Sequence, residues 1–521
     1  MMKRYKSLIT RLVLVISILC YGTSCSDFLE ETDPSNLTAD SFYKIAQHAE
    51  AGIYAVYAET RFMAAGAGIF SYNWQLLEAP TGTSQSETAQ NSDLNNLYSL
   101  TYDGNTQHIV NWWRQLYRIV AQANLVIKNV PAIEMDEVRK KAILGEARFL
   151  RAWAYFYAVR LWGDIPLITE PQTASSEDFL PKRSSQDEVY AQIVEDLTIA
   201  EAAGLLWMDG SGRVSQAAVK AMLSKVYLTM AGNPLKKGAS HYKLAADKAF
   251  EIITYSQSNP SSINLFSQYA DMHDVAQDNK LEHLFQVQYL ADITGNPLQL
   301  AMLPYYKPIS AGAANGIGTT VPTKQFFASY ETGDLRAKNQ EGYFYTSYYY
   351  FGNGDAYQLG APYIYKHFDL KTHGKPGVAG TGRSDLNVMN IRYAEILLTY
   401  AEAQNELGAP TTDAYNALKK IRDRAKLTTP ALATFNQSTF REAVWRERWY
   451  ELCYEGVTWF DMVRLKKVFN ETTKGFDEFA GHVNQSSMQP LQEKHLLMPL
   501  PAPEMKNNLN LTPQNPGYPG I

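Results

Sequence analysis

The sequence has few cysteines, which limits its covalent chemistry. Cys20, Cys25 and Cys453 are the only three in 521 residues. Cys20 lies in a hydrophobic N-terminal run and Cys25 follows shortly after, so beyond this region Cys453 stands alone and has no partner for a disulfide. Cys453 lies in a segment predicted to be helical, and we expect an inert buried thiol rather than a nucleophile.

The motifs of common catalytic and cofactor sites are also missing. The nine histidines include no i, i+4 pair of the HExxH type, and no G-x-x-x-x-G-K loop or G-x-S-x-G turn occurs. We therefore expect no cofactor. Asp93, Asn95 and Asn96 could offer oxygen ligands to a structural Ca²⁺ ion, although they lack the spacing of an EF-hand loop.

Three carboxylates follow one another at helical spacing near the C-terminal end. Glu447, Glu451 and Glu455 lie at i, i+4 and i+8, so they share one face and could form a glycosidase pair. The alternative is a partly buried network of ion pairs, because arginines are frequent in the same apolar helices. These arginines are Arg148, Arg151, Arg160, Arg441, Arg446, Arg448 and Arg464. We favour the ion-pair network.

Long hydrophobic runs are absent except near the N-terminus. Residues 12–20 are apolar and follow a basic stretch, but nine residues are too few for a membrane span of about 20. This pattern predicts an export signal over residues 1–24. The small residues 22–24 before Cys25 are similar to a lipobox, which predicts lipidation of Cys25, with ordinary signal-peptidase cleavage as the alternative.

Positive charge is not in excess. The chain has 48 basic and 53 acidic residues, and removal of residues 1–24 takes away four basic side chains and no acidic ones, leaving a net charge of −9. A partner as negatively charged as nucleic acid is therefore not expected.

Helical periodicity dominates most of the chain. It predicts helices over residues 39–63, 107–130, 135–162, 184–203, 214–231, 239–257, 391–408, 412–426 and 437–469. Tyr155 and Tyr227 are 72 residues apart, close to two tetratricopeptide periods, although amphipathic helices also resemble one another by chance. We expect a mainly α fold with tetratricopeptide-like helical repeats over about 38–257 and 391–469.

Residues 258–390 differ in composition, being rich in Asn, Gly, Pro, Tyr and Thr. A structureless loop of this length is implausible, so we expect an insertion of short strands and ordered loops. The tail 490–521 is Pro-rich and predicted to be extended. The length alone would suggest about three domains, but the pattern favours one domain over 25–521.

Several motifs together resemble those of the SusD/RagB family of outer-membrane nutrient-binding lipoproteins. They are Gly145–Ile168 with its Trp-Gly-Asp-Ile-Pro turn, Trp113–Tyr117 with Ala123-Asn124, Arg213–Ala218, Arg392–Leu398, Glu447–Leu452 with Glu455-Gly456 and Asp461, and Leu509–Thr512 with Asn515-Pro-Gly517. These motifs occur in order over the whole chain, which is more specific than any one of them.

The resemblance implies four tetratricopeptide-like helix pairs and a more variable glycan-contacting region. It also implies pairing with a SusC-like TonB-dependent transporter, which the protein would cover as a lid. Acidic residues after Cys25, namely Asp27, Glu30 and Glu31, are similar to the surface-export signal of such lipoproteins. The implied location is the outer membrane, lipid-anchored and exposed on the cell surface.

A glycan site needs flat aromatic rings bordered by polar side chains, because a sugar presents both a C–H face and hydroxyls. Two stretches have this composition, and their candidate glycan-binding residues are Tyr72, Trp74, Asn95 and Tyr98 in the first, and Tyr343, Tyr345, Tyr348, Tyr349 and Tyr350 in the second. For the second stretch, packing of a hairpin on the helical scaffold is the alternative. Tryptophans 112, 113, 153, 162, 445, 449 and 459 occur in the signature helices and are expected in the core.

The resulting hypothesis is a non-enzymatic surface lipoprotein that captures an oligosaccharide or polysaccharide and delivers it to the transporter. Peptide-binding members of the same family are an alternative. A secreted helical glycoside hydrolase and a peptide-binding tetratricopeptide scaffold are the others.

Overall fold

The structure is a computed structural model, and it describes residues 42–88, 91–305, 316–349, 356–369 and 384–520. The predicted export signal 1–24 and Cys25 lie outside the described residues, as does Tyr350.

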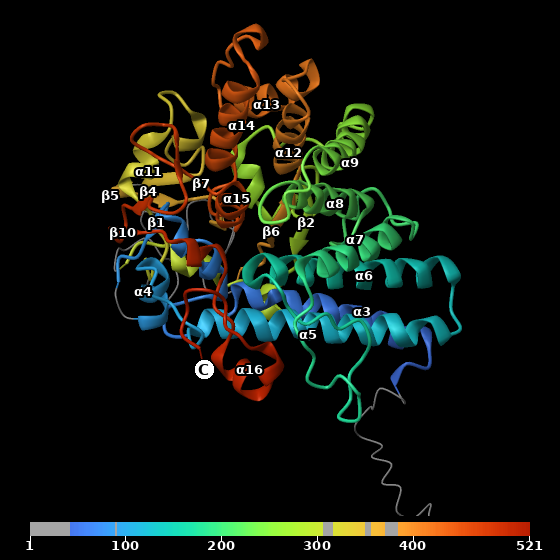
Figure 1. The fold of residues 1–521 in the computed structure, drawn as a ribbon. Helices are drawn as coiled ribbons and strands as arrows, with labels where there is room; N and C mark the ends of the chain where they lie inside the picture. Colours follow the sequence, from blue (N-terminus) through green and yellow to red (C-terminus); the bar gives the residue numbers. More distant parts are fainter. Residues whose placement is uncertain (1–41, 89–90, 306–315, 350–355, 370–383, 521) are drawn as a thin grey trace, which may run out of the picture.

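The fold is mainly helical, as predicted (Figure 1). The helices are α3 (Ala46–Glu59), α4 (Ser92–Tyr98), α5 (Gln107–Asn129), α6 (Glu137–Trp162), α7 (Gln186–Glu201), α8 (Gln216–Ala231), α9 (Ala239–Ser258), α10 (Ala291–Thr294), α11 (Lys324–Ser329), α12 (Tyr393–Glu406), α13 (Thr412–Arg424), α14 (Gln437–Glu451), α15 (Thr458–Leu465) and α16 (Ala502–Asn507). Seven of the nine predicted segments each contain one observed helix within two residues of the expected bounds, and the segment 39–63 contains α3, which begins later, at Ala46.

Local signals fix where these helices begin and end. Helix α7 starts at a reciprocal cap, in which the Ser185 hydroxyl accepts from the Glu188 N–H and the Glu188 carboxylate accepts from the Ser185 N–H. Helix α6 starts at Asp136, whose side chain accepts from the Arg139 N–H at 2.8 Å. It ends at Gly163, whose φ of +74° suits glycine.

Successive long helices pack side by side, so that the chain builds a solenoid-like layer. Contacts join α5 to α6, α6 to α7, α7 to α8 and α8 to α9, and α12 then packs on α9, α13 and α14. Figure 1 shows α5 and α6 alongside each other with α7 and α8 above them. Helix α6 is buried over most of its length, including Phe149, Trp153 and Trp162. Its sequence is apolar on nearly every face because neighbouring helices cover it.

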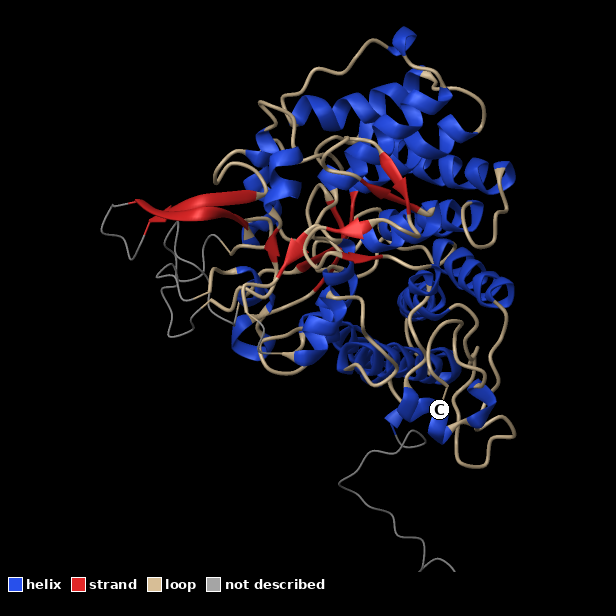
Figure 2. Cartoon of the chain, turned by 60° about the vertical axis from the view of Figure 1, so that its left-hand side comes forward, coloured by secondary structure: helices blue, strands red, loops and turns tan. Residues whose placement is uncertain are grey.

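Short strands occur in the predicted insertion, as expected, and also outside it. They form five antiparallel pairs among the described residues, β1 (Ser84–Gln85) with β3 (Val321–Pro322), β2 (His283–Val287) with β6 (Val388–Arg392), β4 (Phe344–Tyr349) with β5 (Ala356–Ile364), β7 (Lys467–Phe469) with β8 (Phe476–Glu478), and β9 (Val483–Asn484) with β10 (Gln489–Pro490). The β4–β5 pair is the hairpin predicted for the tyrosine-rich stretch, with Tyr348 opposite Tyr357. In Figure 2 a pair of long strands reaches away from the body of the molecule.

Two sequence predictions about the C-terminal third are wrong. The segment 437–469 is two helices, α14 and α15, separated by a turn in which Tyr454 and Gly456 have φ of +61° and +71°. Cys453 lies in this turn and not inside a helix. It is the buried free thiol that was expected, and burial raises the pKa of this thiol to about 11. The tail is not extended throughout, because Ala502–Asn507 forms α16, tied to the body by the Ala502 N–H donating to the Gly104 carbonyl.

A buried network of ion pairs joins the insertion to the helices. Glu451 on α14 contacts Arg424 at 2.5 Å, Arg392 at 2.9 Å and Arg336 at 3.2 Å. Glu455 pairs with Arg392 as well. Burial alone would raise the pKa of the Glu451 carboxyl, but the three arginines hold it well below its usual range. These carboxylates are thus members of an ion-pair network, as predicted, and not an open catalytic pair. Their partners are not the arginines of the same helices that the sequence suggested, because Arg336, Arg392 and Arg424 come from other segments.

Candidate functional site

The first predicted aromatic stretch lies mostly in the core. The Trp74 side chain is 1% exposed and meets the His367 ring edge to face at 5.8 Å. Tyr72 is also buried, and the Tyr98 hydroxyl donates to the Thr319 carbonyl at 2.8 Å. Trp74 therefore has no open face for a sugar, which corrects the expectation of a stacking platform there. The aromatic and polar composition around Trp74 indicated a surface site, but Trp74 lies with Leu76 and Leu77 in one buried 3₁₀ turn.

The second predicted aromatic stretch also begins in the core. Tyr343 and Tyr345 are both fully buried, and the Tyr343 hydroxyl donates to Glu451 at 2.9 Å. They are corrected to core positions under the hairpin. For Tyr348 and Tyr349 the structure describes only the backbone, in β4. These two residues and Tyr350 remain predictions.

A polar pocket of about 380 Å³ lies where the first stretch reaches the surface. It is lined by Gln85, Ser86, Glu87, Thr88, Asn95, Tyr98, Ser99, Ser486 and Ser487. Strand β1 and the residues after it supply one wall, helix α4 supplies Asn95 and Tyr98, and the turn between β9 and β10 supplies the two C-terminal serines. Of the predicted site residues, Asn95 and Tyr98 are thus brought together.

Glu87 connects this pocket to the tyrosine-rich hairpin. One carboxylate oxygen accepts from the Tyr363 hydroxyl of β5 at 2.5 Å, and the other accepts from the Tyr305 N–H at 2.9 Å. The Glu87 N–H donates to the Gly318 carbonyl at 2.7 Å. The two stretches that the sequence marked separately therefore meet at Glu87, which the sequence analysis did not single out.

The serine turn was also missed, because its residues are about 390 positions from Asn95 in sequence. Asn484 holds the serine turn in position, because its side-chain amide donates to the Pro80 carbonyl at 2.9 Å. Gly82 has a φ of +83° and approaches that amide so closely that a Cβ would clash with it. Next to the turn, Met488 is 67% exposed and offers an apolar surface. No local pattern could have predicted this approach.

An exposed aromatic ring lies near the other end of α4. Phe70 is 42% exposed and has a φ of +57°. Asn91, which caps α4 by accepting from the Leu94 N–H, also donates through its amide to the Ile69 carbonyl at 2.9 Å. The Phe70 loop is therefore held beside the start of α4.

Burial raises the pKa values of two groups on the inner side of the pocket, Tyr98 and Glu78. It raises the pKa of Tyr98 to about 12. It also raises the pKa of Glu78 to about 8, although the Gly456 N–H donates to one of its oxygens at 2.7 Å. Glu87 is the one carboxylate among the residues that line the pocket. The lining is thus rich in hydroxyls and amides, which suits an uncharged polyhydroxy ligand more than bond cleavage by two carboxylates.

In the described part of the chain, no group of three or more His, Cys, Asp or Glu could hold a metal ion. The Ca²⁺ site suggested by Asp93, Asn95 and Asn96 stays a prediction. Over the same residues, no helix has the length and hydrophobicity to cross a membrane.

The fold is shared with solved structures of known family. A SusD superfamily protein from Parabacteroides distasonis is 33% identical, and the match covers 93% of this chain and 100% of that one with a TM-score of 0.83. The chain belongs to the SusD family. Its mainly α, tetratricopeptide-like fold is the SusD fold, as expected.

Further comparisons agree with membership of the SusD family. The model of the SusD family matches residues 328–518, and a second model, described as "Starch-binding associating with outer membrane", matches residues 27–228. SusD-like protein P2 of Formosa agariphila is 28% identical over 99% of this chain and all of its own length. A laminarin-binding SusD-like protein is 22% identical, with 91% and 100% coverage and a TM-score of 0.68. Where these descriptions name an activity it is binding, which agrees with the expectation that the chain is not an enzyme.

Proposed function

We propose that this SusD-family protein is a cell-surface lipoprotein that captures an oligosaccharide or polysaccharide without altering it. It then delivers the glycan to a SusC-like TonB-dependent transporter. The observation that carries the proposal is the polar pocket at Asn95, in a chain whose relatives include proteins described as starch-binding and laminarin-binding.

The chemistry of the pocket suits a sugar. Hydroxyl and amide groups from Gln85, Asn95 and Ser487 line it, and these match the donors and acceptors of sugar hydroxyls. Met488 is exposed directly after Ser487 and can cover the C–H face of a pyranose ring. Because few apolar contacts are available, we expect micromolar to millimolar affinity, which suits release to a transporter.

The test begins with a polysaccharide panel that includes laminarin and starch, applied to the mature protein. Titration calorimetry with the best ligand then compares Asn95→Ala and Met488→Ser with Asn507→Ala, a matched change at an exposed position on α16. We expect about tenfold weaker binding for each of the first two and no change for the third. Release of cleaved products, or competition by peptides at the same residues, would contradict the proposal.

Anchoring and delivery need tests in cells. Cys25→Ala should release the protein from the outer membrane into a soluble fraction, because two or more acyl chains are needed for stable anchoring. Affinity purification from detergent-solubilised membranes should recover a TonB-dependent transporter. Retention of the Cys25→Ala protein in the membrane, without any transporter, would contradict both statements.

A further inference from the structure

Arg160 is held differently from its neighbours on α6. Arg148 and Arg151 pair with Asp196 at 2.9 and 2.7 Å. The Arg160 guanidinium instead lies between two rings, with its Cζ 3.7 Å from the centroid of Phe156 and 3.6 Å from that of Phe460. Its Nε donates to the Phe156 carbonyl at 2.8 Å. Among the residues that the structure describes, no carboxylate forms an ion pair with it.

The carboxylates that approach Arg160 are engaged elsewhere. Asp461 accepts from Arg448 and from Arg464, each at 2.8 Å. Glu395 pairs with Lys225 at 2.9 Å. Burial lowers the pKa of Arg160 to about 10, so the group is still protonated at neutral pH. A half-buried cation is therefore left without a compensating anion of its own, which is unfavourable where water reaches it only in part.

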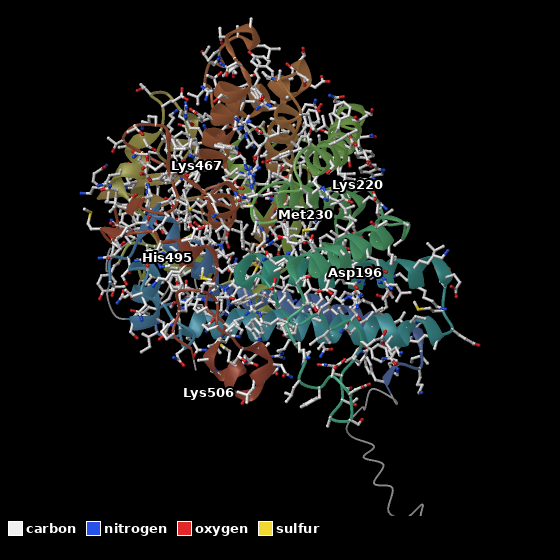
Figure 3. All side chains as sticks on the ribbon, viewed as in Figure 1. Asp196, Lys220, Met230, Lys467, His495 and Lys506 are labelled. Carbon is white, nitrogen blue, oxygen red and sulfur yellow. The ribbon has the colours of Figure 1, made fainter. Side chains whose placement is uncertain are left out.

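Arg160 is one of the residues that line a cavity of about 570 Å³, and this cavity shares no lining residue with the Asn95 pocket. The cavity lies between the ends of α6 and α8, helix α15, the 3₁₀ turn η12 (Glu493–Leu496) and the C-terminal tail. Figure 3 labels Met230 on α8 and His495 on η12, which mark two of these elements. Its volume is in the range typical of small-molecule sites.

Hydrogen bonds hold the walls of this cavity in place. The Met498 N–H donates to the Leu161 carbonyl at 2.6 Å, and the Asn515 amide donates to the Trp162 and Met498 carbonyls at 3.0 and 2.8 Å. On the opposite wall the Asn233 N–H donates to the Arg464 carbonyl at 3.0 Å. The cavity is thus preformed, so a ligand need not order its walls.

The charge around the cavity is positive. Arg464 is balanced by Asp461 and Glu402, and Lys466 by Glu493. Arg160, Lys236 and Lys494 line it as well, and in the described residues none of these three has an ion pair. The remaining wall is largely apolar and includes Val463, Leu496 and Leu497.

We propose that this cavity binds a small organic carboxylate with an apolar body. The carboxylate meets the outer edge of the Arg160 guanidinium, whose planar fork matches it. The apolar body lies against Val463 and Leu497, and Lys494 at the rim adds a second positive charge. This site is independent of the proposed glycan function, since it shares no residue with the Asn95 pocket.

The probe for the test is 4-phenylbutyrate, with 4-phenylbutyramide as its uncharged analogue, each titrated into the mature protein by calorimetry. We expect one molecule of 4-phenylbutyrate to bind per chain. 4-Phenylbutyramide should bind at least about tenfold more weakly, because a charge-assisted hydrogen bond is lost. Arg160→Gln should weaken carboxylate binding by at least about tenfold. Lys506→Gln, a change of equal charge on α16 (Figure 3), should leave it unchanged.

A second variant keeps the test valid if Arg160→Gln perturbs the fold. Val463→Trp fills the cavity with a side chain from its wall and should abolish binding while leaving glycan binding intact. Equal affinity for the acid and the amide, no binding of either, or full affinity in the Val463→Trp protein would overturn the proposal. If the wild-type protein binds no glycan, that result contradicts the proposed function and leaves the carboxylate site unaffected.

Discussion

At the scale of single residues, burial decides which aromatic side chains are available to a ligand. Trp74 and Tyr343 stand in stretches whose composition suggests a binding surface, but both are enclosed. Phe70, which no motif marks, is an exposed aromatic ring, and the aliphatic side chain of Met488 is exposed beside the pocket. Composition reports which side chains are present near a site, whereas the direction in which each points follows from packing.

We expect Trp74→Ala to destabilise the protein by about 3–5 kcal/mol, because it leaves a large cavity in the core. Met488→Ser, at an exposed position, should change the stability by less than about 0.5 kcal/mol. Denaturant unfolding followed by circular dichroism measures both. A Trp74→Ala protein of unchanged stability would mean that the indole is not packed as described.

The Glu78 carboxyl gives a pH-dependent prediction. Its folded-state pKa of about 8 lies above its ordinary value, so from about pH 4.5 to 8 the folded state holds a proton that the unfolded state has released. The contribution of this group to stability therefore falls as the pH rises through that range. Glu78→Gln should flatten the stability profile between pH 6 and 8, whereas Glu442→Gln, at an exposed position, should not. Unfolding curves at pH 6 and 8 measure the difference.

At the scale of elements, the sequence predicts helices well and turns between them less well. Helices α5 to α9 lie within one or two residues of their predicted bounds, because periodicity, caps and Gly breaks all agree. The prediction fails at 452–457, where apolar residues continue through the turn between α14 and α15. That turn is buried against Leu77 and Trp74, so it lacks the run of exposed polar residues by which turns are recognised.

The cap of α7 provides a test at this scale. Ser185→Ala removes the side-chain acceptor for the Glu188 N–H and should cost about 1 kcal/mol. Ser261→Ala, in an exposed loop position, is the matched control and should cost close to nothing. Equal unfolding midpoints for the two variants would show that the cap is not needed.

At the scale of the whole molecule, the ion-pair network around Glu451 ties distant segments together. Arg336 comes from the insertion, Arg392 from the end of β6 and Arg424 from α13, and all three meet a carboxylate on α14. Breaking such a network is costly because the remaining charges stay buried without a partner.

Glu451→Gln should therefore lower the free energy of unfolding by about 3–5 kcal/mol. Because the folded-state pKa of Glu451 is held below its ordinary value, its stabilising contribution is present above the unfolded-state pKa near 4.5 and is lost as the pH falls below it. The wild type should lose stability on acidification more steeply than the variant, as thermal unfolding at pH 3.5 and 7 would show. Parallel profiles would contradict this role for Glu451.

The sequence by itself determined the helical scaffold and the family, since these follow from periodicity and from motifs at short range. It also predicted that Glu447, Glu451 and Glu455 form ion pairs, but their partners Arg336, Arg392 and Arg424 come from distant segments. The tertiary structure alone decided which polar residues line a common pocket. Ser486 and Ser487 line the same pocket as Asn95 because Asn484 holds their turn against Pro80, and Arg160 lines a cavity together with residues of α15 and the C-terminal tail. These arrangements depend on how distant segments pack against one another, so they cannot be predicted from short-range sequence patterns.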